Sequence, residues 1–163
     1  MNINKALFLD RDGVINRDFG YVFKIENLEI LDGIISLCQK AQNLGYKLIV
    51  VTNQSGIGRG YYTEEDFWHF MEGISIEFAK FGVKFDAIYF SPYHPESKIK
   101  KYQIGEEFRK PNNGMILKAQ EDFNLNLEKS VLIGDKITDI QAGISASVGR
   151  NVLISQNCLG VLL

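Results

Sequence analysis

The sequence has few cysteines, no long apolar segment and no strong excess of either charge. Its two cysteines, Cys38 and Cys158, lie far apart, so we expect no disulfide framework and a reducing cytoplasm. No apolar run approaches the roughly 20 residues of a membrane helix, and the N-terminus lacks the apolar stretch and cleavage site of a secretory signal. The formal net charge is -2 and no basic run exceeds Lys98 to Lys101, so we expect neither a nucleic-acid partner nor a membrane partner.

The chain does have an ordinary globular composition. Its 163 residues are 45% hydrophobic and 23% charged, which is enough apolar material for one buried core. No internal repeat and no linker interrupts it. We therefore expect a single domain over residues 1–163, present as a monomer.

Short apolar runs alternate with segments at helical spacing along the whole chain. The runs predict strands at 5–9, 47–51, 85–90, 131–133 and 151–154, and the spacing predicts helices at 32–43, 63–82, 113–123 and 138–146. Near-continuous apolar strands separated by helices favour an α/β fold, in which a parallel sheet is covered by helices on both faces. Ligands of such sheets bind beyond the carboxyl ends of the strands.

Two acids follow the first predicted strand. Asp10 and Asp12 stand one residue apart, and Gly13 comes next. Taken alone, this segment has an equally good interpretation as an exposed turn, because Asp and Gly are common in turns.

Polar residues also follow the second and fourth strands. Thr52, Asn53, Gln54 and Ser55 precede a glycine-rich segment whose N–H groups can face an anion, although a capped turn explains them as well. Asp135 follows the fourth strand and alone could be a helix cap. Arg109 and Lys110 lie before a proline and could be a solvated basic pair.

Together these segments indicate one site. The carboxylates of Asp10, Asp12 and Asp135 can hold Mg²⁺, which prefers oxygen ligands. Thr52 and Lys110 can bind the oxygens of a phosphoryl group. Phosphoryl transfer needs an in-line nucleophile and positive charge around those oxygens, and carboxylates are known nucleophiles toward phosphorus.

In their order and at their strand ends, these motifs resemble the haloacid dehalogenase-like phosphohydrolase superfamily. The resemblance implies a Rossmann-like sheet, a magnesium ion, Asp10 as the nucleophile and Asp12 as the general acid and base.

A closer resemblance is to the subgroup of that superfamily that contains heptose-bisphosphate and histidinol-phosphate phosphatases. It covers nearly all of residues 1–154 and implies a small sugar-phosphate substrate. The substrate-binding residues that we expect from it are Arg11, Asp18, Phe19, Gly20, Tyr21, Thr52, Asn53, Gln54, Ser55, Arg109, Lys110 and Lys136. Arg11 lies between the two key acids, and its default interpretation is a surface residue that pairs with an acid. Arg59 either steers anions to the site or is solvated.

One departure from these relatives concerns zinc. Many of them bind a structural zinc ion through cysteines and a histidine, at positions that are occupied here by Ser91, Tyr93, Glu106 and Phe108. None of these supplies a thiolate or imidazole, so we expect no zinc. We expect the loop to be held by the packing of Tyr93, Tyr102, Ile104 and Phe108.

No insertion is long enough for a large cap domain. We expect an open site covered by the loops 18–24, 56–62 and 91–110. Histidinol phosphate or another phosphomonoester remains an alternative substrate. A non-catalytic binding protein and a polynucleotide phosphatase are further alternatives, which the complete motif set and the acidic pI argue against.

Overall fold

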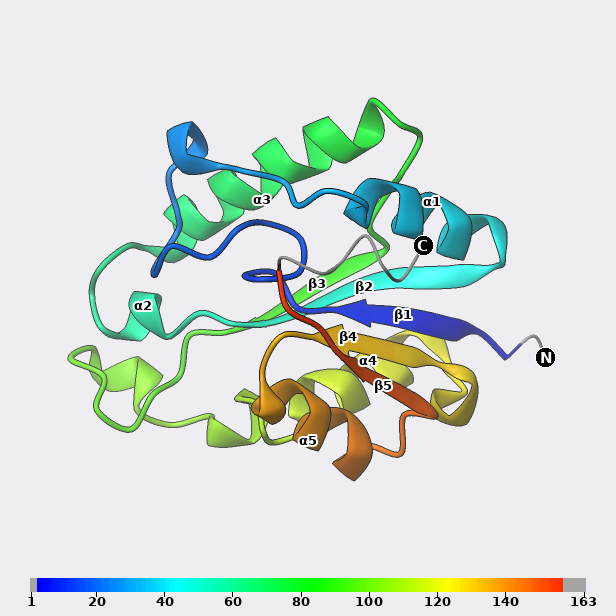
Figure 1. Cartoon of the computed structure of the whole chain (residues 1–163). Helices are drawn as coiled ribbons and strands as arrows, with labels where there is room; N and C mark the ends of the chain where they lie inside the picture. Colours follow the sequence, from blue (N-terminus) through cyan, green and yellow to red (C-terminus); the bar gives the residue numbers. More distant parts are fainter. Residues whose placement is uncertain (1–2, 157–163) are drawn as a thin grey trace.

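The computed structural model describes residues 3–156, so Cys158 lies outside the described residues. A parallel sheet of five strands, in the order β3-β2-β1-β4-β5, forms its centre (Figure 1). The strands are β1 (Lys5–Leu9), β2 (Tyr46–Asn53), β3 (Ala87–Ser91), β4 (Val131–Gly134) and β5 (Arg150–Leu153). The predicted parallel α/β sheet is confirmed.

Helices cover both faces of this sheet. In Figure 1, α1 (Ile34–Asn43) and α3 (Glu64–Ala79) lie on one face, and α4 (Gly114–Phe123) and α5 (Ile137–Ser145) lie on the other. The short helix α2 (Ser55–Gly58), which we did not predict, follows β2. Within residues 3–156, no helix has the length and apolar character needed to cross a membrane.

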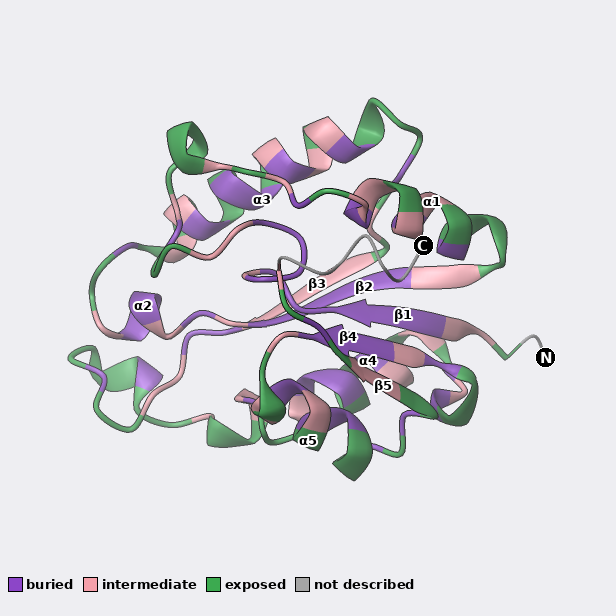
Figure 2. Ribbon diagram, viewed as in Figure 1, coloured by how far each residue is buried: buried purple, intermediate pink, exposed green. Residues whose placement is uncertain are grey.

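The central strand β1 is buried on both sides, which is why its sequence is apolar throughout. Leu7 and Leu9 pack with α1 and α3 in one cluster, whereas Ala6 and Phe8 pack with α4 and α5 in another. Figure 2 shows the buried colour running along β1 and β2. Each face of β1 therefore supports a separate apolar layer.

The long helix α3 begins at a capping box. The Thr63 hydroxyl accepts from the Asp66 N–H at 3.1 Å, and the Asp66 carboxylate accepts from the Thr63 N–H at 2.8 Å. Its inner face buries Phe67, Phe70, Met71, Ile74 and Phe78, whereas Phe81, inside the helix predicted at 63–82, lies beyond its end and is exposed. That end of the prediction was wrong because the helix stops at Ala79.

The strand order reverses beside β1, and this reversal determines where the site lies in the sheet. In parallel sheets, the carboxyl ends of the two strands at such a switch point flank a crevice. Here β1 and β4 are those strands, and the Asp10 N–H donates to the Ile133 carbonyl at 3.1 Å. The residues that follow β1 and β4 are thus neighbours.

The loop between β3 and α4 is held by aromatic and polar contacts. The ring of Tyr93 lies 6.4 Å from those of both Tyr102 and Phe108, and Tyr102 is buried. Ser97 Oγ donates to the Gly58 carbonyl at 2.5 Å, which ties the loop to α2. Ile104 is 82% exposed, so its predicted packing role was wrong.

Burial should make the thiol of Cys38 unreactive. Cys38 lies on the inner face of α1 with no exposed surface, and burial raises the pKa of its thiol to about 12. In a Cys158→Ser variant, we expect no reaction with a disulfide reagent near about pH 8 while the protein is folded, and complete reaction in denaturant. Modification of the folded variant at the rate of a free thiol would contradict this assignment.

Candidate active site

A pocket of about 400 Å³ opens at the carboxyl ends of the strands. It is lined by Asp10, Asp12, Asp18, Gly20, Tyr21, Asn53, Gln54, Ser55, Gly56, Tyr62, Arg109, Lys110, Lys136, Thr138 and Asp139. Most of the predicted site residues therefore meet in one place. Arg11, Phe19, Thr52 and Asp135 are not among the lining residues. Gly56 and Tyr62 belong to a loop expected to cover the site, Asp139 was expected only to orient Lys136 or the metal shell, and Thr138 was not predicted.

A buried ammonium group lies at the floor of the pocket. Lys110 Nζ lies 3.1 Å from Asp10 Oδ1 and 2.5 Å from Asp139 Oδ1, and it donates to the Val51 carbonyl at 2.8 Å. Burial alone would lower the pKa of Lys110, but Asp10 and Asp139 outweigh burial and raise it. Lys110 is therefore a permanent cation beside Asp10.

Asp139 holds this arrangement together. Besides pairing with Lys110, its carboxylate accepts from the main-chain N–H groups of Asp135 and Lys136, each at 3.1 Å. A Cβ at Gly134 would come within 2.2 Å of the Asp139 side chain, so only glycine fits there. The sequence shows Asp139 one helical turn after Asp135, but nothing in that spacing identifies Lys110 as its partner.

Three carboxylates gather at the ends of β1 and β4. One oxygen from each of Asp10, Asp135 and Asp139 lies within 4.8 Å of the others. Burial raises the pKa of Asp10 well above its usual range; Lys110 opposes this effect, and the neighbouring carboxylates add to it. Burial also raises the pKa of Asp135. The acids are crowded, and a cation between them would offset their repulsion.

The residues fit a divalent cation. Oδ1 of Asp135 is buried and has no hydrogen-bond partner among residues 3–156, so it is available as a ligand. Gly13 allows this carboxylate to approach, since a Cβ at that position would lie 2.1 Å from Asp135 Oδ2. Asp139 accepts from Lys110 and from two backbone N–H groups, and Asp10 also pairs with Lys110, so Asp135 has the least occupied carboxylate of the three.

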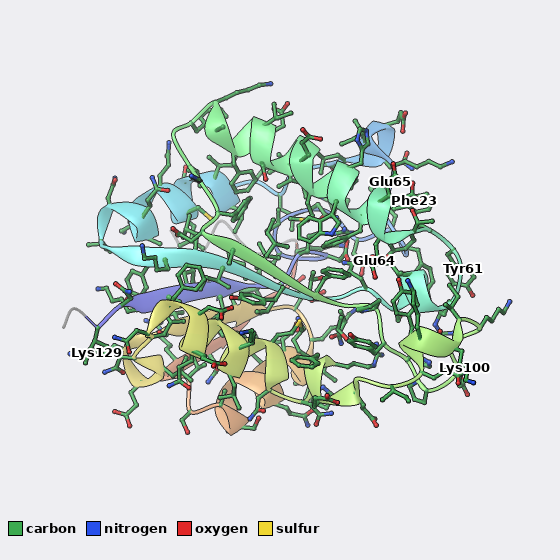
Figure 3. The ribbon with its side chains drawn as sticks, turned by 180° about the vertical axis from the view of Figure 1, so that it is seen from behind. Phe23, Tyr61, Glu64, Glu65, Lys100 and Lys129 are labelled. Carbon is green, nitrogen blue, oxygen red and sulfur yellow. The ribbon has the colours of Figure 1, made fainter. Side chains whose placement is uncertain are left out.

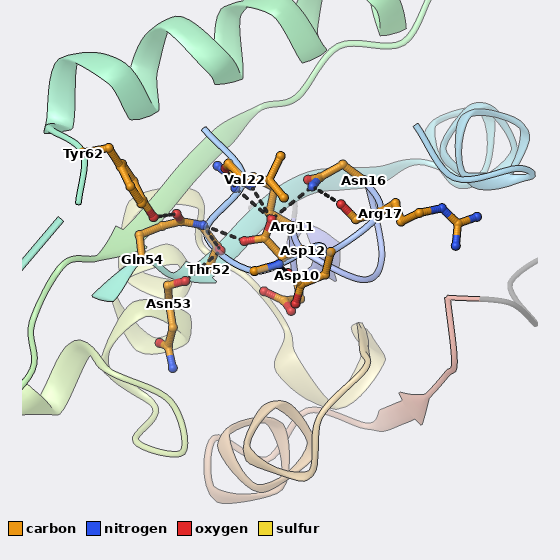
Figure 4. Close-up of polar contacts among 12 residues, drawn as sticks. Asp10, Arg11, Asp12, Asn16, Arg17, Val22, Thr52, Asn53, Gln54 and Tyr62 are labelled. Carbon is orange, nitrogen blue, oxygen red and sulfur yellow. Dashed lines mark hydrogen bonds and ion pairs between the residues drawn. The ribbon is translucent and has the colours of Figure 1, made fainter. Parts of the chain in front are cut away.

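The Asp12 carboxylate is not part of that group. Its Oδ1 accepts from Arg11 Nη2 at 2.8 Å and Asn16 Nδ2 at 3.0 Å, and its Oδ2 accepts from Gln54 Nε2 at 3.1 Å (Figure 4). Donors thus hold it at the wall of the pocket, apart from the carboxylates of Asp10 and Asp135. The prediction that three carboxylates of 10, 12 and 135 surround one ion does not match this geometry.

Gln54 connects Asp12 to the end of β2. Its Nε2 also donates to Thr52 Oγ1 at 2.9 Å, and its Oε1 accepts from the Tyr62 hydroxyl (Figure 4). Burial raises the pKa of Tyr62, so this hydroxyl remains a donor. Thr52 is fully buried and lies behind Gln54 rather than in the pocket wall.

Arg11 is a core residue, and its interpretation as a surface residue was wrong. The side chain is fully buried; its Nη2 donates to the Val22 carbonyl at 2.6 Å, and its guanidinium lies 4.6 Å from the centre of the Phe70 ring. It pairs with Asp12 and so joins that acid to the loop 18–24 and to α3. Arg11 supports the site from behind instead of lining it.

The rim is formed by the loops expected to cover the site. The Asp18 carboxylate accepts from the Gly20 N–H at 2.8 Å, and Tyr21 packs edge-on against Tyr61 with ring centres 4.7 Å apart. Phe19 is 62% exposed and is not a lining residue. Arg109 faces the pocket from the loop 91–110, and its Nη1 donates to the Tyr93 carbonyl at 3.4 Å.

Known proteins resemble this chain over most of its length. The polynucleotide kinase 3 phosphatase family matches residues 12–147. The D-glycero-alpha-D-manno-heptose-1,7-bisphosphate 7-phosphatase of Burkholderia mallei is 58% identical over 151 residues, which cover 93% of this chain and 80% of that protein. The D-glycero-beta-D-manno-heptose-1,7-bisphosphate 7-phosphatase of Yersinia pestis is 44% identical, with coverage of 91% and 79%.

A solved structure shares the fold. D,D-heptose 1.7-bisphosphate phosphatase from B. bronchiseptica, complexed with magnesium and phosphate, aligns with a TM-score of 0.79 and 26% identity. The alignment covers 90% of this chain and 78% of that one.

Removal of the Arg11 side chain should destabilise the fold. In Arg11→Ala, Asp12 loses its buried partner and the Val22 carbonyl loses its donor, so we expect a loss of about 3 kcal/mol in the free energy of unfolding, measured with urea. Arg17→Ala is the control: its partner Glu29 is 54% exposed, and we expect less than about 1 kcal/mol. Equal losses in the two variants would contradict a supporting role for Arg11.

Proposed function

Because the chain belongs to the polynucleotide kinase 3 phosphatase family and, within the haloacid dehalogenase-like fold, to the D-glycero-D-manno-heptose-1,7-bisphosphate 7-phosphatases, we propose that it removes the 7-phosphate of D-glycero-D-manno-heptose 1,7-bisphosphate. The resemblance predicted from the motifs is confirmed by these matches. The observation that carries the proposal is the joining of Asp10 and Asp12 with Lys110, Arg109 and Lys136 in one pocket. One ligand in the pocket can therefore contact both the carboxylates proposed to carry out the reaction and the cations proposed to bind phosphate.

In the first step, an Asp10 carboxylate oxygen attacks the phosphorus of the 7-phosphate. The bond from phosphorus to the sugar oxygen breaks, and Asp12 gives its proton to that oxygen, which leaves as the hydroxyl of the sugar. In the second step, Asp12 takes a proton from a water molecule, whose oxygen attacks the aspartyl-phosphate. Inorganic phosphate leaves, and the Asp10 carboxylate is regenerated.

The surrounding residues position these groups. The ammonium of Lys110, already 3.1 Å from Asp10, neutralises charge that develops on the phosphoryl oxygens. Arg109 and Lys136 bind the substrate from the rim, with Asn53 and Ser55. Asp10 and Asp135 hold Mg²⁺, which when bound neutralises further phosphate charge.

The proposal includes the setting of the reaction. We place it in the cytoplasm, in the synthesis of heptose precursors for lipopolysaccharide and other surface polysaccharides, with the whole chain acting as one domain and as a monomer. The protein needs magnesium and no zinc, because Ser91, Tyr93, Glu106 and Phe108 offer zinc no thiolate or imidazole.

A substrate panel tests this function. The purified protein is assayed for phosphate release with Mg²⁺ on both anomers of heptose 1,7-bisphosphate, on histidinol phosphate and on a 3′-phosphorylated oligonucleotide. We expect kcat/KM to be highest for a heptose bisphosphate and to vanish when magnesium is chelated. A preference for histidinol phosphate or for the oligonucleotide would overturn the proposal.

Asp10→Asn should abolish turnover without unfolding the protein. An amide is a poor nucleophile, and removal of a nucleophile lowers kcat by at least about 10³-fold. The substitution also relieves the crowding of buried carboxylates, so we expect the midpoint of thermal unfolding to be maintained or raised. Residual activity above a few per cent would count against attack by Asp10.

Gly13→Ala should weaken the binding of magnesium. The new Cβ displaces Asp135, and we expect the Mg²⁺ concentration for half-maximal activity to rise by about 10-fold or more. Gly45→Ala is a matched control, because Gly45 also has a positive φ (+83 against +87 for Gly13) but open space around its Cβ position. Both variants should lose about 1–2 kcal/mol of stability. A similar magnesium response in both would refute this role for Gly13.

A further inference from the structure

The two oxygens of the Asp12 carboxylate have different surroundings. Oδ1 accepts from Arg11 Nη2 and from Asn16 Nδ2, and both of these residues are fully buried. Oδ2 accepts from Gln54 Nε2 at 3.1 Å, and Gln54 lines the pocket together with Asp12. Since a carboxylate oxygen has about two lone-pair sites, Oδ1 is filled, whereas within residues 3–156 Oδ2 has a site left beside Gln54. Oδ2 is therefore the oxygen that can face a bound substrate.

The amide of Gln54 is fully engaged by the protein. Its nitrogen carries two N–H donors, which bind Asp12 Oδ2 and, at 2.9 Å, Thr52 Oγ1 (Figure 4). The residue is only 2% exposed. Gln54 is therefore better placed to hold Asp12 than to donate to a phosphate.

Tyr62 determines which way this amide faces. Its hydroxyl donates to Gln54 Oε1 (Figure 4). In the reverse orientation, Oε1 would face the Asp12 carboxylate, acceptor against acceptor, and the Tyr62 hydroxyl would lose its carbonyl partner. Asp12 and Tyr62 therefore select the same orientation of Gln54.

The ring of Tyr62 is itself fixed by packing. It stacks on Phe23 with ring centres 4.9 Å apart and an angle of 13° between the planes. A Cβ at Gly56 would come within 2.3 Å of the Tyr62 ring, so glycine allows the ring to lie against α2. Phe23 in turn lies near the start of α3, at the end of the molecule opposite Lys129 (Figure 3). The loop 18–24 and α2 thus hold the Tyr62 hydroxyl in place.

We propose that Gln54 and Tyr62 are positioning residues for the general acid: Gln54 holds Asp12 Oδ2 toward the leaving oxygen of the substrate, and Tyr62 keeps the Gln54 carbonyl turned away from Asp12. This inference rests on the proposed function, in which Asp12 gives a proton to that oxygen. A Gln54 carbonyl that faced Asp12 would accept the same proton. With the carbonyl bound by Tyr62, the proton stays available to the leaving oxygen.

Phosphate esters with different leaving groups test the positioning role. Wild type, Tyr62→Phe and Gln54→Met are assayed with Mg²⁺ on heptose 1,7-bisphosphate, phenyl phosphate and p-nitrophenyl phosphate. p-Nitrophenolate is a weak base that leaves without a proton, whereas phenolate and a sugar alkoxide are much more basic and need one. The two aryl esters are similar in size, so a difference between them reports on proton donation and not on contacts with the substrate.

The expected losses concern kcat/KM, which includes the departure of the leaving group. We expect Tyr62→Phe to lower kcat/KM by about 3- to 10-fold on the bisphosphate and on phenyl phosphate, the range for one neutral hydrogen bond. Gln54→Met also removes the bond to the charged Asp12 and should cost about 10- to 100-fold on both. On p-nitrophenyl phosphate, each variant should stay within about twofold of wild type.

The double variant shows whether Tyr62 acts through Gln54. Once the amide is absent, loss of the Tyr62 hydroxyl should cost less than about a further twofold on the bisphosphate, so the two losses should not add. Additive losses would overturn the proposed link from Tyr62 to Asp12.

Tyr89→Phe is the matched control. The Tyr89 hydroxyl donates to Asp122 Oδ2 at 2.6 Å, so this variant also removes one hydroxyl and its hydrogen bond, but neither residue lines the pocket. We expect it to hydrolyse all three substrates as wild type does.

Asp12→Asn separates this inference from the function on which it rests. If Asp12→Asn impairs phenyl phosphate more than p-nitrophenyl phosphate, but the Gln54 and Tyr62 variants impair both equally or neither, the positioning role is wrong and Asp12 remains the acid. Losses confined to the bisphosphate would also overturn it, in favour of contacts with the sugar. If Asp12→Asn impairs both aryl esters equally, or if wild type does not hydrolyse the bisphosphate, the proposed function itself fails.

Discussion

The ion pairs of Lys110 with Asp10 and Asp139 are the interactions on which the site depends. They join the loop before α4 to the end of β1 and to the first turn of α5, three segments that are distant in sequence. A buried charge is tolerated only when it is paired and hydrogen-bonded, and the Val51 carbonyl completes the set of acceptors around this ammonium. The network holds the Asp10 carboxylate in one orientation at the floor of the pocket.

One ammonium does not balance the acids around it. Asp10, Asp135 and Asp139 gather within 4.8 Å, and burial with mutual repulsion raises the pKa values of Asp10 and Asp135. Protein interiors avoid such crowding unless a function requires it. Gly13 makes the crowding sterically feasible, and the buried Oδ1 of Asp135 has no partner in the described chain. A cation bound beside Asp10 would therefore offset the repulsion among these carboxylates.

Much of this arrangement could be predicted from the sequence, because the carboxyl ends of parallel strands lie at one edge of the sheet. Strand periodicity places Asp10, Gln54 and Lys136 near that edge, whereas the resemblance to known phosphatases marked Gln54 and Lys136 as substrate-binding residues. The features that could not be predicted depend on the orientation of individual side chains. Arg11 lies between two site acids and yet points into the core under Phe70, and the Asp12 carboxylate turns toward Gln54 instead of the other acids. Tertiary contacts decide such orientations, and no local pattern encodes them.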